Sequence, residues 1–342
     1  MSTDTPASLG YRWPAEWEPH AATWLAWPHK PETWPGKFEP IPGIYATLVR
    51  TLSAFEPVHI CAGGDRVMAE AKMLVGGLRH VVLHDIPTND VWARDHGPMF
   101  LSGPAPLPPA LIDWEYNAWG GKYPPFDLDN LVSARVARLT DRRVFTPGII
   151  LEGGAVDGNG GGTVLTTEQC LLNPNRNPQL SRADVERYLR DYCCAKKILW
   201  LGGGIVGDDT DGHIDELARF VGPTTVVVAL EEDPRDENYE PLQDNYRRLQ
   251  GMSDERGRPL EVIPIPMPRP LFFEDARLPA CYMNFYIANG VVIVPQFNDP
   301  ADRVAVETLA RLFPGRQIRG LDAVDLAWGL GAYHCITQQQ PV

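Results

Sequence analysis

Cys335, near the C-terminus, is the candidate nucleophile of this 342-residue chain. Gly329 and Gly331 precede it, and glycine lets a backbone approach neighbouring groups closely. A thiol held at the edge of a cavity in this way could attack an electrophilic carbon. The alternative is a structural role, because free cysteine is among the most buried residue types. The polar residues 337–340 that follow, and the polar residues described next, favour the chemical role.

Four polar residues elsewhere in the chain could join the cysteine. Asp95 stands just before a Gly-Pro turn, and Glu152 follows an apolar stretch and precedes two glycines. His213 and Asp215 are two residues apart, so their side chains would share one face of an extended segment. Each residue alone could be a turn former, a strand end or a half-buried histidine. Taken together, they predict a catalytic set of one cysteine, one histidine and three carboxylates.

Two other chemistries compete for the same residues. A divalent metal ion could be held by a His-x-Asp pair and further carboxylates. The set contains one histidine beside a thiol, so no metal is expected. A Cys-His amidase or protease would attack a neutral carbonyl and stabilise an oxyanion with hydrogen-bond donors. Three nearby carboxylates would repel that oxyanion.

Carboxylates suit a cationic, planar substrate. A guanidinium group carries five donors in a fixed fork and pairs with a carboxylate through two hydrogen bonds at once. Cys335 could attack the guanidinium carbon while His213 protonates the departing nitrogen, and His213 could then activate a water that hydrolyses the amidino-thioether. The net reaction would turn a guanidine into a urea and release ammonia. An inactive guanidine-binding module remains an alternative.

The composition excludes several classes of partner. The formal net charge is −13 and the pI is near 5.1, so a small cationic substrate is expected, and neither nucleic acid nor an anionic membrane. The six cysteines form no C-x-x-C pair. The sequence has no signal-peptide pattern and no run of about eighteen apolar residues. A cytoplasmic protein without a cofactor is therefore predicted, and the sequence leaves a homo-oligomer open.

Hydrophobic periodicity predicts alternating helices and strands along the chain. The expected helices span residues 44–55, 67–78, 131–139, 181–193, 239–250 and 302–313. The expected strands span residues 58–61, 80–84, 110–116, 148–152, 198–201, 225–230 and 261–265. The last of these contains Pro264, which predicts a sheet edge or a strand end. Asn289-Gly290 between the apolar stretches 282–287 and 291–294 predicts a hairpin.

The helices and the polar candidates recur at a similar spacing. Helices are expected to begin near residues 130, 182, 239 and 300. Asp95 and Glu152 are 57 residues apart, and Glu152 and His213 are 61 apart. The 122 residues from His213 to Cys335 are twice that interval, which places a skipped repeat near Glu274. If each repeat contributes one inward position, these side chains converge on one axis. The pattern predicts a single α/β domain built as a closed, quasi-symmetric array rather than a doubly wound sheet, with a frayed start over residues 1–10.

The sequence resembles the agmatine deiminase family, within the guanidino-group-modifying superfamily. The most specific motifs are His-Cys-Ile-Thr-Gln-Gln at 334–339 and Thr-Asp-Gly-His-Ile-Asp at 210–215. The other similar segments are residues 13–20, 23–28, 89–98, 117–122, 152–154 and 284–295. This resemblance implies a five-unit, pseudo-symmetric α/β propeller of ββαβ-type units, the pentein fold. It also implies hydrolysis of agmatine to N-carbamoylputrescine and ammonia, with a deiminase of free or peptidyl arginine, or of another guanidine, as the alternative.

The resemblance also implies roles for the catalytic set. It makes Cys335 the nucleophile, which would form a covalent amidino-cysteine intermediate, and His213 the acid and base. Asp95 and Asp215 would hold the guanidinium. Glu152 would orient both the guanidinium and His213.

The far end of the substrate needs other partners. Asn89 and Trp92 match positions that line the substrate pocket in related enzymes. Agmatine ends in an ammonium group, which an acidic side chain or an aromatic face could bind. Trp92, Trp119 and Asp209 with its neighbour are the candidates. Arg94 is expected to point away, because successive residues of an extended segment face opposite sides.

Overall fold

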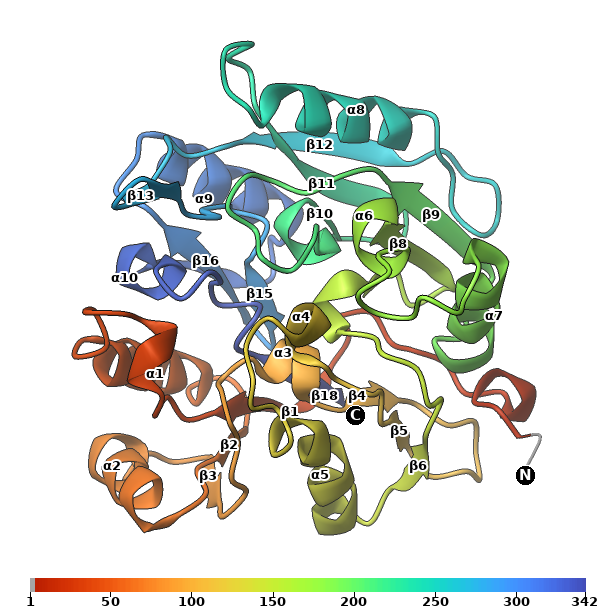
Figure 1. Ribbon diagram of the computed structural model, residues 1–342. Helices are drawn as coiled ribbons and strands as arrows, with labels where there is room; N and C mark the ends of the chain where they lie inside the picture. The colour runs from red at the N-terminus through yellow and green to blue at the C-terminus, as the bar shows by residue number, and fades with distance from the viewer. Residues whose placement is uncertain (1–3) are drawn as a thin grey trace.

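Across residues 4–342, which the computed structural model describes, the strands form five sheets of three or four strands and one two-stranded hairpin (Figure 1). The three-stranded sheets are β4 (Met99–Leu101), β5 (Ala110–Ile112) and β6 (Arg143–Phe145); β7 (Asp157–Gly158), β8 (Thr163–Thr167) and β9 (Lys197–Leu201); β10 (Ala218–Phe220), β11 (Thr225–Leu230) and β12 (Glu261–Pro266); and β15 (Tyr286–Ala288), β16 (Val291–Gln296) and β17 (Gln317–Asp322). The four-stranded sheet contains β18 (Gln338–Pro341), β1 (His20–Ala26), β2 (Val58–Cys61) and β3 (Val81–His84), and the hairpin contains β13 (Phe272–Phe273) and β14 (Ala276–Arg277).

The five sheets share one pairing order. In each of them an antiparallel pair comes first, and the next strand runs parallel to its neighbour. Parallel neighbours need a crossover connection, which is usually a helix. The crossover helices are α1 (Ile41–Leu52), α2 (Asp65–Val75), α5 (Val132–Thr140), α7 (Arg182–Tyr192), α8 (Tyr239–Gln250) and α9 (Ala301–Leu312).

The remaining helices are short. They are α3 (Ala93–His96), α4 (Ala118–Gly121), α6 (Glu168–Leu171), α10 (Val324–Ala327), and five 3-10 helices within the described chain at Ala7–Leu9, Pro31–Thr33, Asp129–Leu131, Gly153–Ala155 and Ile214–Glu216. Figure 1 shows α2, α5, α7 and α8 at the periphery, whereas α3 and α4 lie near the centre. Between residues 4 and 342, no helix has both the length and the apolar character needed to cross a bilayer.

Burial follows the sequence pattern of each element. Residues 226–228 of β11 and 291–294 of β16 are apolar throughout and fully buried, as expected for strands covered on both faces. α8 instead buries one stripe, formed by Leu242, Asn245 and Leu249, at helical spacing. The long helices therefore cover the outside of the sheets, and the short helices and loops are left to build the centre.

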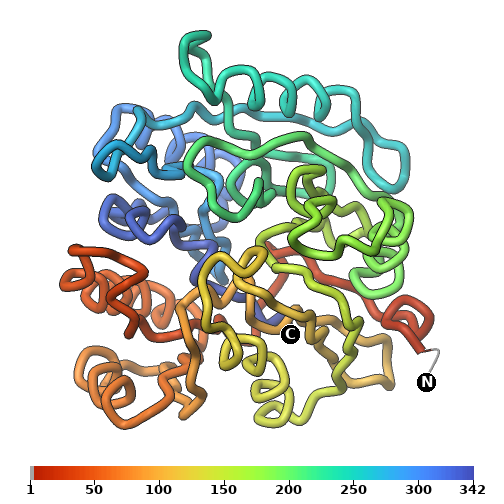
Figure 2. The backbone as a smooth tube through the Cα atoms, viewed as in Figure 1, coloured from red at the N-terminus to blue at the C-terminus, as the bar shows by residue number. Residues whose placement is uncertain are grey.

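The first and last strands of the described chain pair in the four-stranded sheet. β18 pairs with β1 in antiparallel register, with Trp24 opposite Gln338. Figure 2 shows the C-terminus inside the outline of the molecule and the N-terminal residues at its edge. The segment just before β18, which carries Cys335, is thereby held close to the N-terminal part of the chain.

Most predicted elements are confirmed, and so is the α/β class. α8 spans the expected residues, and the other long helices begin and end within about three residues of expectation. Ser181 and Asp184 form the capping box that the sequence predicts for α7. β12, which contains Pro264, lies at the edge of its sheet.

Three strand predictions are wrong in the same way. The strand expected over 110–116 ends at Ile112, residues 148–152 form only an isolated bridge, and β15 begins at Tyr286 rather than at residue 282. In two of these cases the chain leaves the sheet to deliver a side chain to the site described below, Glu152 from residues 148–152 and Asn284 from the segment before β15. An apolar pattern cannot distinguish a strand from a buried segment that runs on past the end of the sheet.

Two further expectations need correction. The start of the chain is not frayed over residues 4–10, because Ala7–Leu9 forms a 3-10 helix and Leu9 packs against a buried cluster; residues 1–3 lie outside the described residues. Glu274, expected at the skipped repeat, is exposed in the turn between β13 and β14. The inward position beside Cys335 is occupied by Asn284 instead.

Candidate active site

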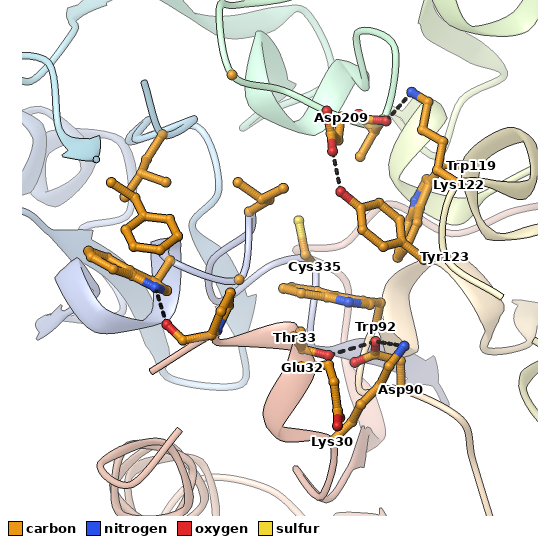
Figure 3. A pocket seen from close by; sticks show the side chains of 18 of the residues that line it. Lys30, Glu32, Thr33, Asp90, Trp92, Trp119, Lys122, Tyr123, Asp209 and Cys335 are labelled. Carbon is orange, nitrogen blue, oxygen red and sulfur yellow. Dashed lines mark hydrogen bonds and ion pairs between the residues drawn. The ribbon is translucent and has the colours of Figure 1, made fainter. Parts of the chain in front are cut away.

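Cys335 lies in a cavity of about 560 Å³ (Figure 3). Asp95 lines the same cavity, and so do three of the four residues predicted for the far end of the substrate, Trp92, Trp119 and Asp209. Figure 3 shows the Cys335 sulfur pointing into the open space above the Trp92 indole. The cysteine predicted from sequence is therefore accessible from a cavity although its side chain is buried.

The two glycines before Cys335 allow indole rings to pack on the backbone. A Cβ added at Gly329 would lie 2.6 Å from Trp34 Nε1, and one added at Gly331 would lie 2.5 Å from Trp92 Cζ3. Both distances are too short for real Cβ contacts. The close backbone approach predicted from these glycines is confirmed, and its effect is to set the cysteine beside Trp92.

Asn284 holds Cys335 at both its backbone and its side chain. The amide Oδ1 accepts the backbone N–H groups of His334 and Cys335 at 3.0 and 3.2 Å, and Nδ2 donates to Cys335 Sγ at 3.0 Å. Nδ2 also donates to Glu216 Oε1 at 3.0 Å. One fully buried amide therefore fixes the thiol relative to a neighbouring carboxylate.

Carboxylates surround the thiol. Asp215 Oδ2 lies 3.7 Å and Glu216 Oε1 lies 3.9 Å from Cys335 Sγ. Burial raises the pKa of Cys335 well above its ordinary value, and the charges of Asp215, Glu216 and Asp95 raise it further, while the hydrogen bond from Asn284 opposes them. The thiol is therefore protonated at neutral pH in the free site.

His213 is fully buried behind these carboxylates. Its Nδ1 lies 3.7 Å from Asp95 Oδ1 and 4.0 Å from Asp215 Oδ1. Burial lowers the pKa of His213, but Asp95 and Glu152, together with the buried thiol of Cys170, raise it well above its ordinary value. His213 is therefore in the cationic imidazolium form at neutral pH.

Gly154 makes room for this convergence. A Cβ at Gly154 would lie 2.6 Å from His213 Nδ1, 2.8 Å from Asp95 Oδ1 and 3.1 Å from Asp215 Oδ2. The Gly154 N–H itself donates to Asp95 Oδ1 at 3.0 Å, and Trp119 Nε1 donates to Asp95 Oδ2 at 3.0 Å. Burial raises the pKa of Asp95 to about 6, with His213 opposing the shift.

Glu152 is fully buried and held by Arg176. Arg176 Nε donates to Glu152 Oε1 at 2.6 Å, and Nη1 donates to Asp211 Oδ2 at 2.5 Å. The other Glu152 oxygen has no donor within residues 4–342. Glu152, Cys170 and His213 present three atoms within 4.8 Å of one another, so the carboxylate lies beside the imidazole as predicted.

Two clusters of potential metal ligands occur in this region, and their charges fit a metal poorly. Asp215, Glu216 and Cys335 form one cluster, and Glu152, Cys170 and His213 form the other. Charged donors already occupy both: His334 contacts Asp215 at 2.6 Å, and Arg176 contacts Glu152 at 2.6 Å. These cationic partners reduce the negative charge that a hard divalent ion would need.

Acidic side chains lie at the opening of the cavity, and the cationic side chains there are each paired with a carboxylate. Three lining cations are each matched by a carboxylate: Lys30 with Asp90 at 3.2 Å, Lys122 with Asp211 at 2.8 Å, and Arg277 with Asp236 at 2.7 Å. Asp209 accepts a hydrogen bond from the Tyr123 hydroxyl, and Glu32 also lines the opening. The cavity is therefore suited to a cation at its mouth as well as at its base.

Four of the predicted site residues do not line the cavity: His213, Glu152 and Asp215, which are fully buried next to it, and Asn89. The Asn89 Oδ1 accepts the backbone N–H groups of Leu128 and Asp129 at 2.7 and 3.2 Å. This amide therefore fixes a neighbouring loop, and its contact with substrate stays a prediction. Arg94 points away from the cavity as expected, since Nη1 donates to Gln339 Oε1 at 2.7 Å.

Sequence reasoning missed several side chains of this site. Asn284, Glu216, His334, Arg176, Cys170 and Glu16 all contact a predicted catalytic residue or one of its partners. Glu216 and His334 were detectable, because each directly follows or precedes a predicted residue. The others had no local signal beyond lying in or near segments that resemble the family.

The raised pKa of Cys335 predicts slow alkylation. Labelling by iodoacetamide at pH about 7 should be at least tenfold slower than for the same residue in urea, because each unit of raised pKa removes about 90% of the thiolate. The rate should still be rising above pH 9. Peptide mass spectrometry measures the site and the rate, and labelling of the native protein as fast as the unfolded one would contradict the prediction.

Comparison with known proteins places the chain in a family. A model of Porphyromonas-type peptidyl-arginine deiminase matches residues 12–341. The agmatine deiminase of Pseudomonas aeruginosa (strain LESB58) is 39% identical, over 99% of this chain and 98% of the relative.

Solved structures give the same result. An agmatine deiminase of Enterococcus faecalis has a TM-score of 0.94 at 35% identity, covering 100% of this chain and 98% of that one. A C. jejuni agmatine deiminase with substrate bound has a TM-score of 0.88 at 32% identity, covering 96% of each chain. The chain therefore belongs to the agmatine deiminase family, whose family model is described as Porphyromonas-type peptidyl-arginine deiminase.

Proposed function

We propose that the protein hydrolyses agmatine to N-carbamoylputrescine and ammonia. The observation that carries the proposal is a group of buried acceptors, Asp215 Oδ1, Glu216 Oε2 and Glu152 Oε2, with no donor among residues 4–342. Buried polar atoms are rarely left unpaired, so a bound substrate is expected to supply the donors. A guanidinium offers five N–H donors and the positive charge that these carboxylates need. Relatives named agmatine deiminase support agmatine as that substrate.

The first half of the reaction forms the covalent intermediate. Asp95 and Asp215 bind the guanidinium, and Glu152 orients it together with His213. The arriving cation lowers the pKa of Cys335, so that a thiolate forms beside its target. The sulfur then bonds to the guanidinium carbon, protonated His213 donates to the departing nitrogen, and the C–N bond breaks to release ammonia.

The second half returns the thiol. The amidino-thioether on Cys335 is attacked by a water whose proton passes to the now neutral His213. The new C–O bond forms as the C–S bond breaks, and the ureido product leaves. No step requires a cofactor.

Agmatine differs from arginine at the far end of the chain. We place its ammonium near Asp209 and the rings of Trp92 and Trp119, which line the cavity. Arginine carries a carboxylate as well, and the lining cations described above are already paired. A carboxylate at this position would meet acidic groups without a free partner.

Deimination of free or peptidyl arginine, or of another guanidine, is the alternative. One observation favours a larger substrate: the cavity of about 560 Å³ has an apolar side, to which Phe273, Trp328 and Leu330 contribute. A cysteine-dependent amidase or amidinotransferase is less well supported, because the carboxylates near Cys335 oppose an oxyanion. An inactive guanidine-binding module is excluded by any turnover.

We also propose that residues 1–342 form a single catalytic domain in which the five sheets surround one axis as the pentein propeller. Two observations support this arrangement. Every sheet has the same strand order, and the pairing of β18 with β1 joins the last repeat to the first. A cytoplasmic location is proposed from the six cysteines, all free in the described chain. The net charge of −13 speaks against nucleic acid or an anionic membrane as partners.

The substrate assignment predicts a clear preference. Agmatine should exceed free arginine in kcat/KM by at least about 10²-fold, the discrimination expected when a charged group is left unpaired or opposed. Ammonia release from agmatine, arginine and a C-terminal arginyl peptide, measured side by side, tests this. Equal or faster turnover of arginine or the peptide would overturn the agmatine assignment and leave the cysteine mechanism standing.

The nucleophile prediction concerns Cys335→Ser. Loss of the thiol should lower kcat by roughly 10⁴-fold or more, because no covalent intermediate can form at a useful rate. Cys170→Ser, a second buried cysteine near His213, serves as the comparison and should retain far more activity. A Cys335→Ser variant with a tenth of the original rate would refute the covalent mechanism.

Gly154→Ala tests the convergence of the three side chains. The added methyl must displace His213, Asp95 or Asp215, so kcat/KM should fall by about 10²-fold or more while the fold is retained. Gly43→Ala is the matched control, because its Cβ would meet nothing within 4 Å and it lies inside α1. The control should keep full activity and unfold at the same or a slightly higher temperature. Unchanged kinetics in Gly154→Ala would show that this geometry does not matter.

A further inference from the structure

A buried chain of charged side chains lies directly behind the nucleophile. His334 Nδ1 is 2.6 Å from Asp215 Oδ2, and His334 Nε2 is 2.8 Å from Glu16 Oε2. His334, Asp215 and Glu16 are exposed by only 2%, 0% and 5%. Glu16 comes from the N-terminal segment and Asp215 from the 3-10 helix Ile214–Glu216, so the imidazole bridges two distant parts of the chain.

Both partners of the imidazole are carboxylate oxygens, and an ionised carboxylate can only accept. Both ring nitrogens of His334 must then donate, which requires the imidazolium form. Glu16 remains ionised, because Arg219 Nη2 and Arg94 Nη2 lie 2.9 and 3.2 Å from its Oε2. Burial raises the pKa of Glu16, but these guanidinium groups and His334 hold it well below its ordinary value.

Only one of the two carboxylate oxygens of Asp215 therefore has a donor. Its Oδ2 is engaged by His334, whereas Oδ1 has no donor within the described chain and lies 4.0 Å from His213 Nδ1. Burial raises the pKa of Asp215, but the hydrogen bond and charge of His334 lower it below its ordinary value. The contact with His334 therefore leaves Asp215 Oδ1, and not Oδ2, for a guanidinium.

We propose that His334, anchored by Glu16, is a positioning residue that holds Asp215 as a carboxylate and directs its free oxygen at the substrate guanidinium. This inference rests on the proposed function. Neither His334 nor Asp215 lines the cavity, but Asp215 lies 3.7 Å from the Cys335 sulfur, which does. Both ring nitrogens of His334 are already engaged by carboxylates, so it acts through Asp215 rather than on the substrate. The next residue in the sequence, Cys335, forms the covalent bond. The His334 imidazolium keeps Asp215 negatively charged beside it.

Without His334, the surroundings of Asp215 would favour protonation. Burial and nearby carboxylates both destabilise a second negative charge. The charged or titratable groups that face Asp215 are His213, Glu216 and Arg219 from its own segment, Asp95 from α3, Cys281 from the segment before β15, and Cys335 and His334 from the segment before β18. Arg219 is the remaining cation besides His213, and its shortest carboxylate contact is with Glu16.

The test separates binding from catalysis. Agmatine affinity is measured by calorimetry from about pH 4 to pH 9 for Cys335→Ser alone and for the double variant Cys335→Ser with His334→Gln. Removing the imidazolium raises the pKa of Asp215, so the pH below which binding weakens should move upward by about one unit or more. Glutamine can still donate one hydrogen bond, so affinity at the upper end of the range should change much less.

His29→Gln in the Cys335→Ser background is the matched control. His29 also bridges two acceptors, the backbone carbonyls of Trp27 and Thr88 at 2.9 and 3.0 Å, but neither belongs to the site. It should leave the pH dependence of binding in place. An unchanged pH dependence in folded His334→Gln overturns the inference, whereas absence of agmatine binding to Cys335→Ser at every pH overturns the proposed function instead.

A second measurement avoids the variant altogether. Nitrogen NMR of the intact protein, labelled at histidine, reports directly whether both ring nitrogens of His334 carry protons. Both ring nitrogens should be found protonated, because each contacts a carboxylate oxygen. A neutral His334 ring at pH 7 would overturn the inference even if His334→Gln fails to fold.

Discussion

The site depends on crowding several carboxylates around one thiol in the protein interior. Like charges in a low dielectric raise one another's pKa, and the structure shows the result: burial, with neighbouring negative charge, raises the pKa of Asp95 to about 6 and that of Glu216 well above its ordinary value. The arrangement is tolerated because cations lie behind it. Arg176 contacts one oxygen of Glu152, and His334 contacts one oxygen of Asp215. The other oxygen of each carboxylate has no donor among residues 4–342.

The pairing of β18 with β1 brings these groups together. The Arg94 backbone N–H donates to the Cys335 carbonyl at 3.0 Å, and the Arg94 side chain contacts Gln339 of β18 and Glu16 of the N-terminal segment. Asp95 is the next residue, so one buried arginine fixes this carboxylate relative to Cys335. A change in the register of β18 would move the thiol and its neighbours together.

Sequence alone identified the residues whose local context is unusual. Glu152 stands next to two glycines, Cys335 follows Gly329 and Gly331 by a few residues, and the regular spacing of the helices indicated the α/β repeat. Asn284, Glu16 and Arg176 could not be predicted, because tertiary packing alone brings them to their partners in the site. Glu16 and His334, for example, are in contact although they lie 318 residues apart in the sequence. The role of Asn89 as a substrate contact stays a prediction, and in the structure its amide oxygen accepts two backbone N–H groups of a loop.

The charges of the site affect both substrate binding and product release in the proposed reaction. In the free site the thiol is protonated and the pKa of Glu216 is raised, chiefly by burial, so the site carries less negative charge than its residue types suggest. A guanidinium reverses this, because its charge favours ionisation of the groups around it. The ureido product is neutral and loses the charge-assisted hydrogen bonds to Asp95 and Asp215. The site therefore binds the cationic substrate more strongly than the neutral product. The reaction removes the charge and so also promotes release of the product.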